Sequence, residues 1–129
     1  MSYVYLNGKF VEGDRAMISV FDQGLLFGDG IFESFRSIGD RLYQFTQHYH
    51  RLVQSAEALM YPVACSQQDL EAILMELKER NRLNDAYYRI TITRGRGQIG
   101  FRRELGDNLT CLVIGREFQA FDESCYTGG

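Results

Sequence analysis

The sequence lacks several features that mark common protein classes. Its 129 residues include no tryptophan, a single proline and no apolar run long enough to cross a bilayer. The N-terminus MSYVYLNGKF lacks the charged and apolar regions of a signal peptide. The cysteines Cys65, Cys111 and Cys125 are odd in number, widely spaced and without a CxxC motif, so neither a disulfide framework nor a zinc site is indicated. These absences predict a cytoplasmic protein with no membrane partner.

Lysine and histidine are also scarce. Arginine supplies 12 of the 14 basic residues, and the lysines are Lys9 and Lys78. Arginine presents a planar fork that suits carboxylates and phosphates, whereas lysine is the residue that forms Schiff bases. The histidines, His48 and His50, are two positions apart on a predicted helix and so face different directions. We therefore expect no histidine-based metal site and no nucleophilic triad.

The overall composition is that of one globular domain. Hydrophobic residues make up 45% of the chain and aromatic residues 13%, which is too much for a disordered segment. The 14 basic and 17 acidic residues leave a net charge of -3. This balance argues against a general polyanion binder, and we expect no nucleic-acid partner.

The residue pattern predicts an α+β fold, with a mainly antiparallel sheet and two helices. Asn7-Gly8 supplies the positive φ angles of a tight hairpin turn, and the spacing of Ser66 and Asp69 fits a helix capping box. Residues 12–30 read as a loop. Strands are expected over 3–6, 9–11, 31–38, 41–43, 86–93 and 109–114, and helices over 46–60 and from 66 onward. This domain is expected to cover residues 1–120, and residues 121–129 resemble a linker.

Glycine and arginine are concentrated in the loop after the 86–93 strand. Gly95, Gly97 and Gly100 match the dinucleotide fingerprint, but residues 101–108 are too few and too rich in turn residues for the helix that this motif needs. Four arginines surround Phe101, a pattern compatible with binding single-stranded nucleic acid: Arg94, Arg96, Arg102 and Arg103. Given the net negative charge, a solvent-facing loop is the better interpretation.

Further arginines are candidates for anion binding. Arg51 lies with His48 and Ser55 along a polar edge of the first helix, where its head can reach over a pocket or simply face solvent. Arg36 and Arg89 lie in the middle of predicted strands. They either point to solvent or together clamp a carboxylate, because a guanidinium binds a carboxylate through two parallel hydrogen bonds.

Several segments together resemble the fold-type IV pyridoxal-phosphate enzymes, which include the class IV aminotransferases and aminodeoxychorismate lyase. The matching stretches cover nearly the whole chain: 5–10 (YLNGKF), 22–24 (DQG), 27–33 (FGDGIFE), His48-x-x-Arg51-Leu52, Tyr88-Arg89 and Thr93-Arg94-Gly95. The resemblance implies the small N-terminal α+β domain of that family, with the interdomain linker beginning over 121–129. It also implies a homodimer.

The resemblance assigns a role to each of five residues. Arg51 is expected to bind the phosphate of pyridoxal 5′-phosphate, and Phe32 to line the substrate pocket. Arg36 and Arg89 match positions that receive the side-chain carboxylate of glutamate in branched-chain aminotransferases. Arg94 is a further expected substrate-binding residue. In this family the pyridoxal ring carries the chemistry, and the protein supplies orientation and charge.

The resemblance stops short of the catalytic lysine. In the family, the lysine that forms the Schiff base lies early in a second, C-terminal domain. Neither Lys9, in the opening hairpin, nor Lys78, on the second helix, matches that position. We therefore expect that the C-terminal domain and every catalytic residue are absent from this chain, which alone should not catalyse transamination.

The implied activity is amino-group transfer between an amino acid and a 2-oxo acid such as 2-oxoglutarate, of the branched-chain or D-amino-acid type. Aminodeoxychorismate lyase is an alternative, although the lyase pattern tends to have a further arginine where this chain has Ile99. The other alternative is a non-catalytic half-enzyme that acts as a binding or interaction module.

Overall fold

The computed structural model describes residues 2–61, 65–96 and 109–118. Within these ranges six strands form one sheet in the order β2-β1-β6-β5-β3-β4, and every neighbouring pair is antiparallel. The strands are β1 (Tyr3–Leu6), β2 (Lys9–Glu12), β3 (Gly30–Ile38), β4 (Arg41–Tyr43), β5 (Ala86–Thr93) and β6 (Thr110–Glu117). The predicted α+β class with an antiparallel sheet is confirmed. The linker expected over 121–129 lies outside the described residues.

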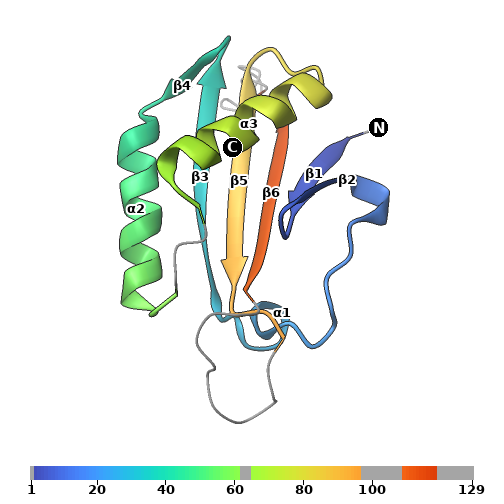
Figure 1. Ribbon diagram of the computed structural model, residues 1–129, viewed down its shortest axis with the longest axis vertical. Coiled ribbons are helices and arrows are strands. Elements are labelled where there is room, and N and C mark those ends of the chain that lie inside the picture. Colours follow the sequence, from blue (N-terminus) through green and yellow to red (C-terminus); the bar gives the residue numbers. More distant parts are fainter. Residues whose placement is uncertain (1, 62–64, 97–108, 119–129) are drawn as a thin grey trace, which may run out of the picture.

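Two long helices cover one face of the sheet (Figure 1). Helix α2 (Phe45–Ala58) packs against β3, and helix α3 (Gln67–Arg80) packs against β1 and β6. Helix α3 begins where the sequence predicts, because the Ser66 side chain accepts a hydrogen bond from the backbone nitrogen of Asp69 at 3.1 Å. No helix in the described ranges is long and apolar enough to span a membrane.

The expectation of a loop over 12–30 is wrong in part. A 3-10 turn, η1 (Gly13–Arg15), and a short helix, α1 (Gln23–Phe27), lie within it, so the described chain has a third α-helix rather than two. Five residues are too few to show a helical period. Helix α1 is instead defined by the residues at its two ends: Asp22 caps its N-terminus, and Gly28, with φ 68°, ends it. The last strand also runs to Glu117 rather than ending at Ile114.

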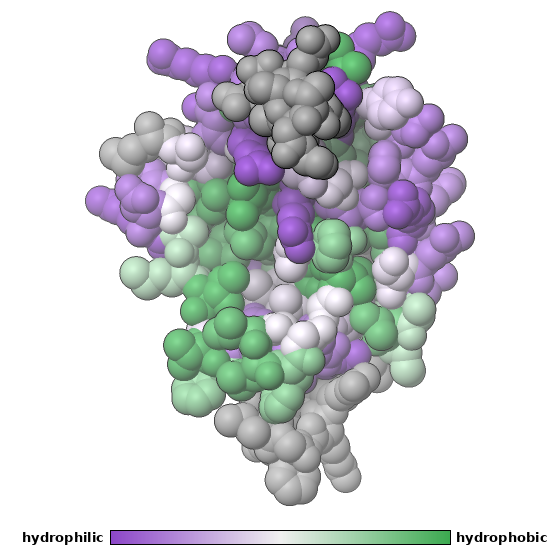
Figure 2. Space-filling model, turned by 180° about the vertical axis from the view of Figure 1, so that it is seen from behind, coloured by the Kyte–Doolittle hydropathy of each residue, from purple (hydrophilic) through white to green (hydrophobic). Residues whose placement is uncertain are grey.

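The strand register divides the sheet residues between two faces. The helix face is turned toward α2 and α3 (Figure 1), and the open face lies on the opposite side. Figure 2 views the molecule from the side of the open face. On the helix face lie Glu33, Phe35, Ser37, Tyr88, Ile90, Ile92, Cys111, Val113 and Gly115. On the open face lie Phe32, Ser34, Arg36, Tyr87, Arg89, Thr91, Leu112, Ile114 and Arg116.

The hydrophobic core lies between the helix face and the two long helices. Its most buried members come from both layers: Phe35, Tyr88, Ile90 and Val113 from the sheet, Leu52 and Ala56 from α2, and Leu70, Leu74 and Leu77 from α3. The predicted alternation of β5 is confirmed, because Tyr88, Ile90 and Ile92 are buried while Arg89 is exposed. The core therefore fixes which side chains β3 and β5 present on the open face.

Candidate functional site

Three of the expected site residues come together on the open face. Ser34 of β3 pairs with Arg89 of β5, and Arg36 pairs with Tyr87. Arg36 and Phe32 are therefore the two diagonal neighbours of Arg89 on β3, at a distance that long side chains can bridge. The guanidinium carbon of Arg89 lies 4.0 Å from the centre of the Phe32 ring. Two guanidinium groups from adjacent strands thus share one surface with an aromatic ring.

These arginines have no acidic neighbours on their own face among the described residues. Strands β3, β5 and β6 contain two acids, Glu33 and Glu117, and the register places both on the helix face. The guanidinium carbon of Arg36 lies 3.7 Å from the centre of the Phe118 ring, and the buried Nε of Arg36 has no hydrogen-bond partner within the described ranges. A guanidinium with free donors and no carboxylate beside it is suited to an anionic ligand.

Arg51 lies apart from this surface, on α2, where its side chain is 68% exposed. Glu33 reaches from the helix face of β3 toward the same helix. Its Oε1 lies 2.8 Å from Nδ1 of His48, and its Oε2 lies 3.8 Å from Nε of Arg51. The side chain of Arg51 makes no hydrogen bond within the described part of the chain. The predicted polar edge of α2 is therefore organised around a buried carboxylate, and the terminal nitrogens of Arg51 stay available for a ligand.

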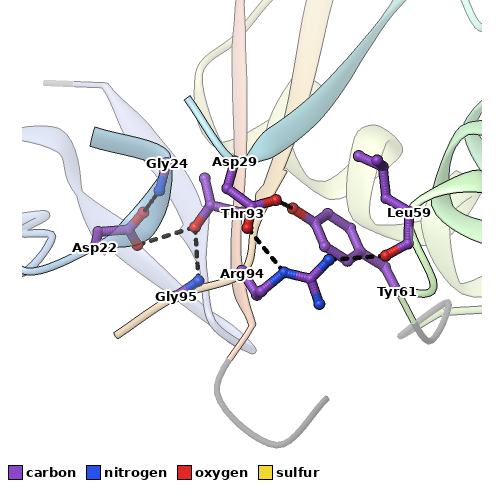
Figure 3. A network of polar contacts seen from close by, with 8 residues as sticks. All are labelled: Asp22, Gly24, Asp29, Leu59, Tyr61, Thr93, Arg94 and Gly95. Atoms are coloured by element: carbon purple, nitrogen blue, oxygen red, sulfur yellow. Dashed lines mark hydrogen bonds and ion pairs between the residues drawn. The ribbon is translucent and has the colours of Figure 1, made fainter. Parts of the chain in front are cut away.

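Arg94 was expected on a solvent-facing loop, and that expectation is wrong, because its side chain is only 3% exposed. Its Nε donates to Oδ2 of Asp29 at 2.9 Å, and its Nη2 donates to the backbone carbonyl of Leu59 at 2.8 Å (Figure 3). The guanidinium also lies over the ring of Tyr61. A helix ends with carbonyls that lack partners, and Arg94 satisfies one of them at the end of α2. Its expected contact with substrate stays a prediction.

A second polar network ties α1 to the ends of β5 and β6. Asp22 is 2% exposed and accepts hydrogen bonds from the backbone nitrogen of Gly24 at 2.8 Å and from the hydroxyl of Thr93 at 3.0 Å (Figure 3). The hydroxyl of Thr110 donates to the same carboxylate at 2.6 Å. The backbone nitrogen of Gly95 in turn donates to Thr93. Together with the Arg94 network, these bonds hold the segment that leads into β3 and its open-face residues.

Sequence reasoning missed three residues that the structure places beside the expected ones: Glu33, Tyr87 and Arg116. Glu33 faces a helix that the local strand pattern does not reveal. Tyr87 shares the open face with Arg89, and its hydroxyl lies 2.7 Å from the Ser34 hydroxyl. The guanidinium carbon of Arg116 lies 5.4 Å from the centre of the Tyr87 ring. No local signal indicated Arg116, because the strand was expected to end at Ile114.

The cysteines offer no nucleophile in the described ranges. Cys65 and Cys111 are free thiols that line a cavity of about 300 Å³ under α3, on the helix face. Burial, and to a lesser extent the neighbouring Cys65, raise the pKa of Cys111 to about 12. The thiol therefore stays protonated at neutral pH, and only a thiolate reacts readily. Among the described residues no group of three or more histidine, cysteine or acidic side chains could hold a metal ion.

Solved structures share this fold. The branched-chain amino acid aminotransferase of Escherichia coli matches 93% of this chain and 41% of its own, with a TM-score of 0.84 and 24% identity. The branched-chain aminotransferase of the archaeon Thermoproteus uzoniensis, solved with norvaline, matches 92% of this chain and 41% of its own, with a TM-score of 0.79 and 23% identity. A further branched-chain amino acid aminotransferase of this fold was solved with pyridoxamine 5′-phosphate. The fold is that of the small N-terminal domain of class IV aminotransferases.

Sequence comparison defines the family. The profile of the family described as amino-transferase class IV matches residues 30–124. The chain is 40% identical over 113 residues to the "Putative branched-chain-amino-acid aminotransferase" of Methanocaldococcus jannaschii. The aligned region covers 86% of this chain and 39% of that protein. It is 32% identical over 95 residues to D-alanine aminotransferase of Staphylococcus haemolyticus, covering 74% and 34%. The chain belongs to the class IV amino-transferase family, and it spans about two fifths or less of the length of these relatives.

Proposed function

We propose that this chain is the substrate- and phosphate-binding part of a pyridoxal-phosphate-dependent aminotransferase acting on an amino acid and a 2-oxo acid. The observation that carries the proposal is the pair Arg36 and Arg89, which share the open face beside Phe32 and have no acidic partner on that face among the described residues. Two guanidinium groups suit the side-chain carboxylate of a substrate such as 2-oxoglutarate, because each can donate parallel hydrogen bonds. The branched-chain and D-alanine aminotransferases among the relatives support this reaction class.

The cofactor phosphate fits Arg51. This guanidinium is exposed, makes no hydrogen bond within the described ranges and is approached by Glu33 only at Nε, 3.8 Å away. Its terminal nitrogens can therefore donate to a dianionic phosphate, which favours arginine. Glu33, which also contacts His48, would orient the Arg51 side chain through its contact with Nε. When bound, pyridoxal phosphate supplies the electron-accepting ring for amino-group transfer.

Phe32 and Arg94 support the substrate side in different ways. The Phe32 ring lies against the guanidinium of Arg89, and stacking on a ring leaves the N–H edges of a guanidinium free for a carboxylate. Arg94 is enclosed by Asp29 and the end of α2. We infer that it acts first by holding the segment that leads into β3, and its direct contact with substrate is a separate prediction.

The lysine that binds the cofactor covalently is proposed to come from outside this chain. Lys9 lies on β2, which β1 and β6 separate from β5. The ammonium of Lys78 is 3.1 Å from Oδ1 of Asp40. Neither lysine lies beside Arg51 or the open-face arginines, so we expect no amino transfer by the 129-residue chain alone. A homodimer is expected from the family only.

Substitution of Arg51 tests the proposal in the polypeptide that the native cell produces. Its intact mass is measured first, because a mass above 14.9 kDa would identify additional chain in which to look for the lysine. In that protein Arg51→Ala should weaken pyridoxal phosphate binding by about 10- to 100-fold, since hydrogen bonds between charged groups contribute about 1.5–3 kcal/mol. The affinity is measured by spectrophotometric titration of the cofactor.

Arg41→Ala provides the matched control, because it removes an exposed arginine from β4. Cofactor affinity equal in wild type and Arg51→Ala would remove Arg51 from the site. Transfer of an amino group to 2-oxoglutarate by the wild-type protein supports the aminotransferase. Pyruvate release from aminodeoxychorismate would support the lyase, and a cofactor-free 14.9 kDa protein would support the half-enzyme.

A further inference from the structure

A third arginine, Arg116, lies on the open face in the same cross-strand row as Arg36 and next to the row of Arg89. Tyr87 of β5 pairs with Arg36 on one side and with Arg116 of β6 on the other. Arg89, one row along, pairs with Ser34 and Ile114. Arg116 is therefore a diagonal neighbour of Arg89 on the open face, just as Arg36 is on the opposite side. The sheet presents three arginines around one tyrosine.

Tyr87 gives Arg116 a defined position. The guanidinium carbon of Arg116 lies 5.4 Å from the centre of the Tyr87 ring, within the range of a cation–π contact. The tyrosine hydroxyl is held in turn at 2.7 Å from the hydroxyl of Ser34. Arg36, Arg89 and Arg116 thus each lie against an aromatic ring, which leaves the charge of each guanidinium without a carboxylate beside it among the described residues.

The charge of this cluster is uncompensated within the described part of the chain. Four other arginines of the described ranges have a carboxylate oxygen within 4.0 Å, namely Arg15, Arg51, Arg80 and Arg94, whereas Arg41, Arg82 and Arg96 have none there. None of the three open-face arginines has one among the described residues, and the buried Nε of Arg36 lacks any hydrogen-bond partner. Three like charges gathered on one face repel one another, and a ligand with several negative charges relieves that repulsion.

We propose that Arg116 is a specificity-determining residue that selects substrates with two carboxylates over those with an apolar side chain. The inference rests on the proposed function. Strands β3 and β6 lie on either side of β5, at about 4.8 Å per neighbouring pair, so the row spans about 10 Å. Long arginine side chains from its two ends can converge on the side-chain carboxylate that Arg36 and Arg89 are proposed to bind, a group that pyruvate lacks. An apolar side chain would instead leave the cations without a partner.

Substitution of Arg116 in the cofactor-loaded protein provides the kinetic test. Arg116→Ala should raise KM for 2-oxoglutarate by about 10-fold or more, the loss of one favourable ion contact, while KM for pyruvate changes by less than about 2-fold. Arg116→Lys should restore part of the preference, because it keeps the charge but loses the fork. An equal change for both acids, or no change, would overturn the proposal.

Arg80→Ala is the matched control. Arg80 also lies against an aromatic ring, 4.8 Å from the centre of Phe10, but on the helix-face side of the sheet. It should leave both KM values unchanged. A similar rise in KM for 2-oxoglutarate in Arg80→Ala would show that the effect is a general loss of positive charge and would overturn the role of Arg116.

A binding experiment separates this inference from the proposed function. The Nε–H resonances of the arginines are followed by NMR in the 129-residue chain during titration with glutarate and, separately, with butyrate at low salt. Glutarate should shift the Arg116 signal and bind about 5-fold or more weakly to Arg116→Ala, while butyrate should not distinguish the two. If no 2-oxo acid is aminated but this difference holds, only the proposed function fails. If glutarate binds both chains equally, the role of Arg116 fails whatever the activity.

Discussion

At the scale of single residues, Arg94 and Arg51 show how differently two arginines of one chain are used. Arg94 is enclosed and bonded to Asp29 and to the carbonyl of Leu59. Arg51 is exposed and lies beside a buried carboxylate, that of Glu33, without a hydrogen bond in the described ranges. An enclosed guanidinium with satisfied donors stabilises the fold, whereas an exposed one with free donors is suited to a ligand.

Removal of the Arg94 side chain should therefore destabilise the folded protein. Arg94→Ala should lower the free energy of unfolding by about 3 kcal/mol, because it takes one partner from a buried ion pair and uncaps α2. Arg94→Lys should recover part of this loss by keeping the charge near Asp29. Urea denaturation followed by circular dichroism measures both variants. A loss below about 1 kcal/mol in Arg94→Ala would contradict the structural role.

At the scale of elements, α1 depends on its contacts more than on its own propensity. Its five residues are too few for a stable isolated helix. The Asp22 carboxylate holds its first turn, and the hydroxyls of Thr93 and Thr110 hold Asp22. Gly24 packs closely against Thr93: a Cβ at position 24 would come within 2.8 Å of the Thr93 Cβ. The space between α1 and the end of β5 is therefore too small for the methyl group of an alanine at position 24.

Gly24→Ala should consequently displace α1 and lower the free energy of unfolding by about 1–3 kcal/mol, the usual cost of overpacking. Leu25→Ala is the control on the same helix, because Leu25 is 68% exposed and its truncation should change stability by less than about 0.5 kcal/mol. Thermal and urea unfolding of the two variants are compared with wild type. Equal stability of Gly24→Ala and wild type would show that α1 and Thr93 can move apart without cost and would contradict this prediction.

At the scale of the whole molecule, the most prominent surface feature is an apolar segment at one end of the sheet. Its large side chains are each at least 43% exposed: Met17, Ile18, Val20, Phe21, Leu25, Leu26 and Phe27. Figure 2 shows apolar side chains gathered toward this end of the open face, at the lower left. Contiguous exposed apolar surface of this kind is typical of a contact with another protein surface.

We expect the 129-residue chain to self-associate through this segment. Replacing both Leu25 and Phe27 with Asp should shift sedimentation velocity profiles toward a monomer at concentrations where wild type is associated, because charged groups resist burial. Met60→Asp is the control, since Met60 is equally exposed at 67% but lies beyond the end of α2. A wild-type chain that stays monomeric at all concentrations would contradict the prediction.

Much of the architecture follows from local sequence pattern. The alternation through Tyr88, Ile90 and Ile92 predicted β5 and its buried face, and Ser66 with Asp69 predicted the start of α3. These succeed because side-chain periodicity and capping act over a few neighbouring residues. Helix α1 escaped the prediction because its stability comes from Thr93 and Thr110, far along the chain from Asp22.

The sequence by itself determined the family, the α+β class and four of the arginines that could bind an anion, Arg36, Arg51, Arg89 and Arg94, but not Arg116. Only the tertiary structure decided which arginines share a surface and added Arg116 to them. Register across β3, β5 and β6 brings Arg36, Arg89 and Arg116 onto one open face, and packing of α2 against β3 brings Glu33 to Arg51. Arg94 became enclosed through a contact with Asp29, 65 positions away. Such pairings depend on how distant segments pack together, and local periodicity carries no information about them.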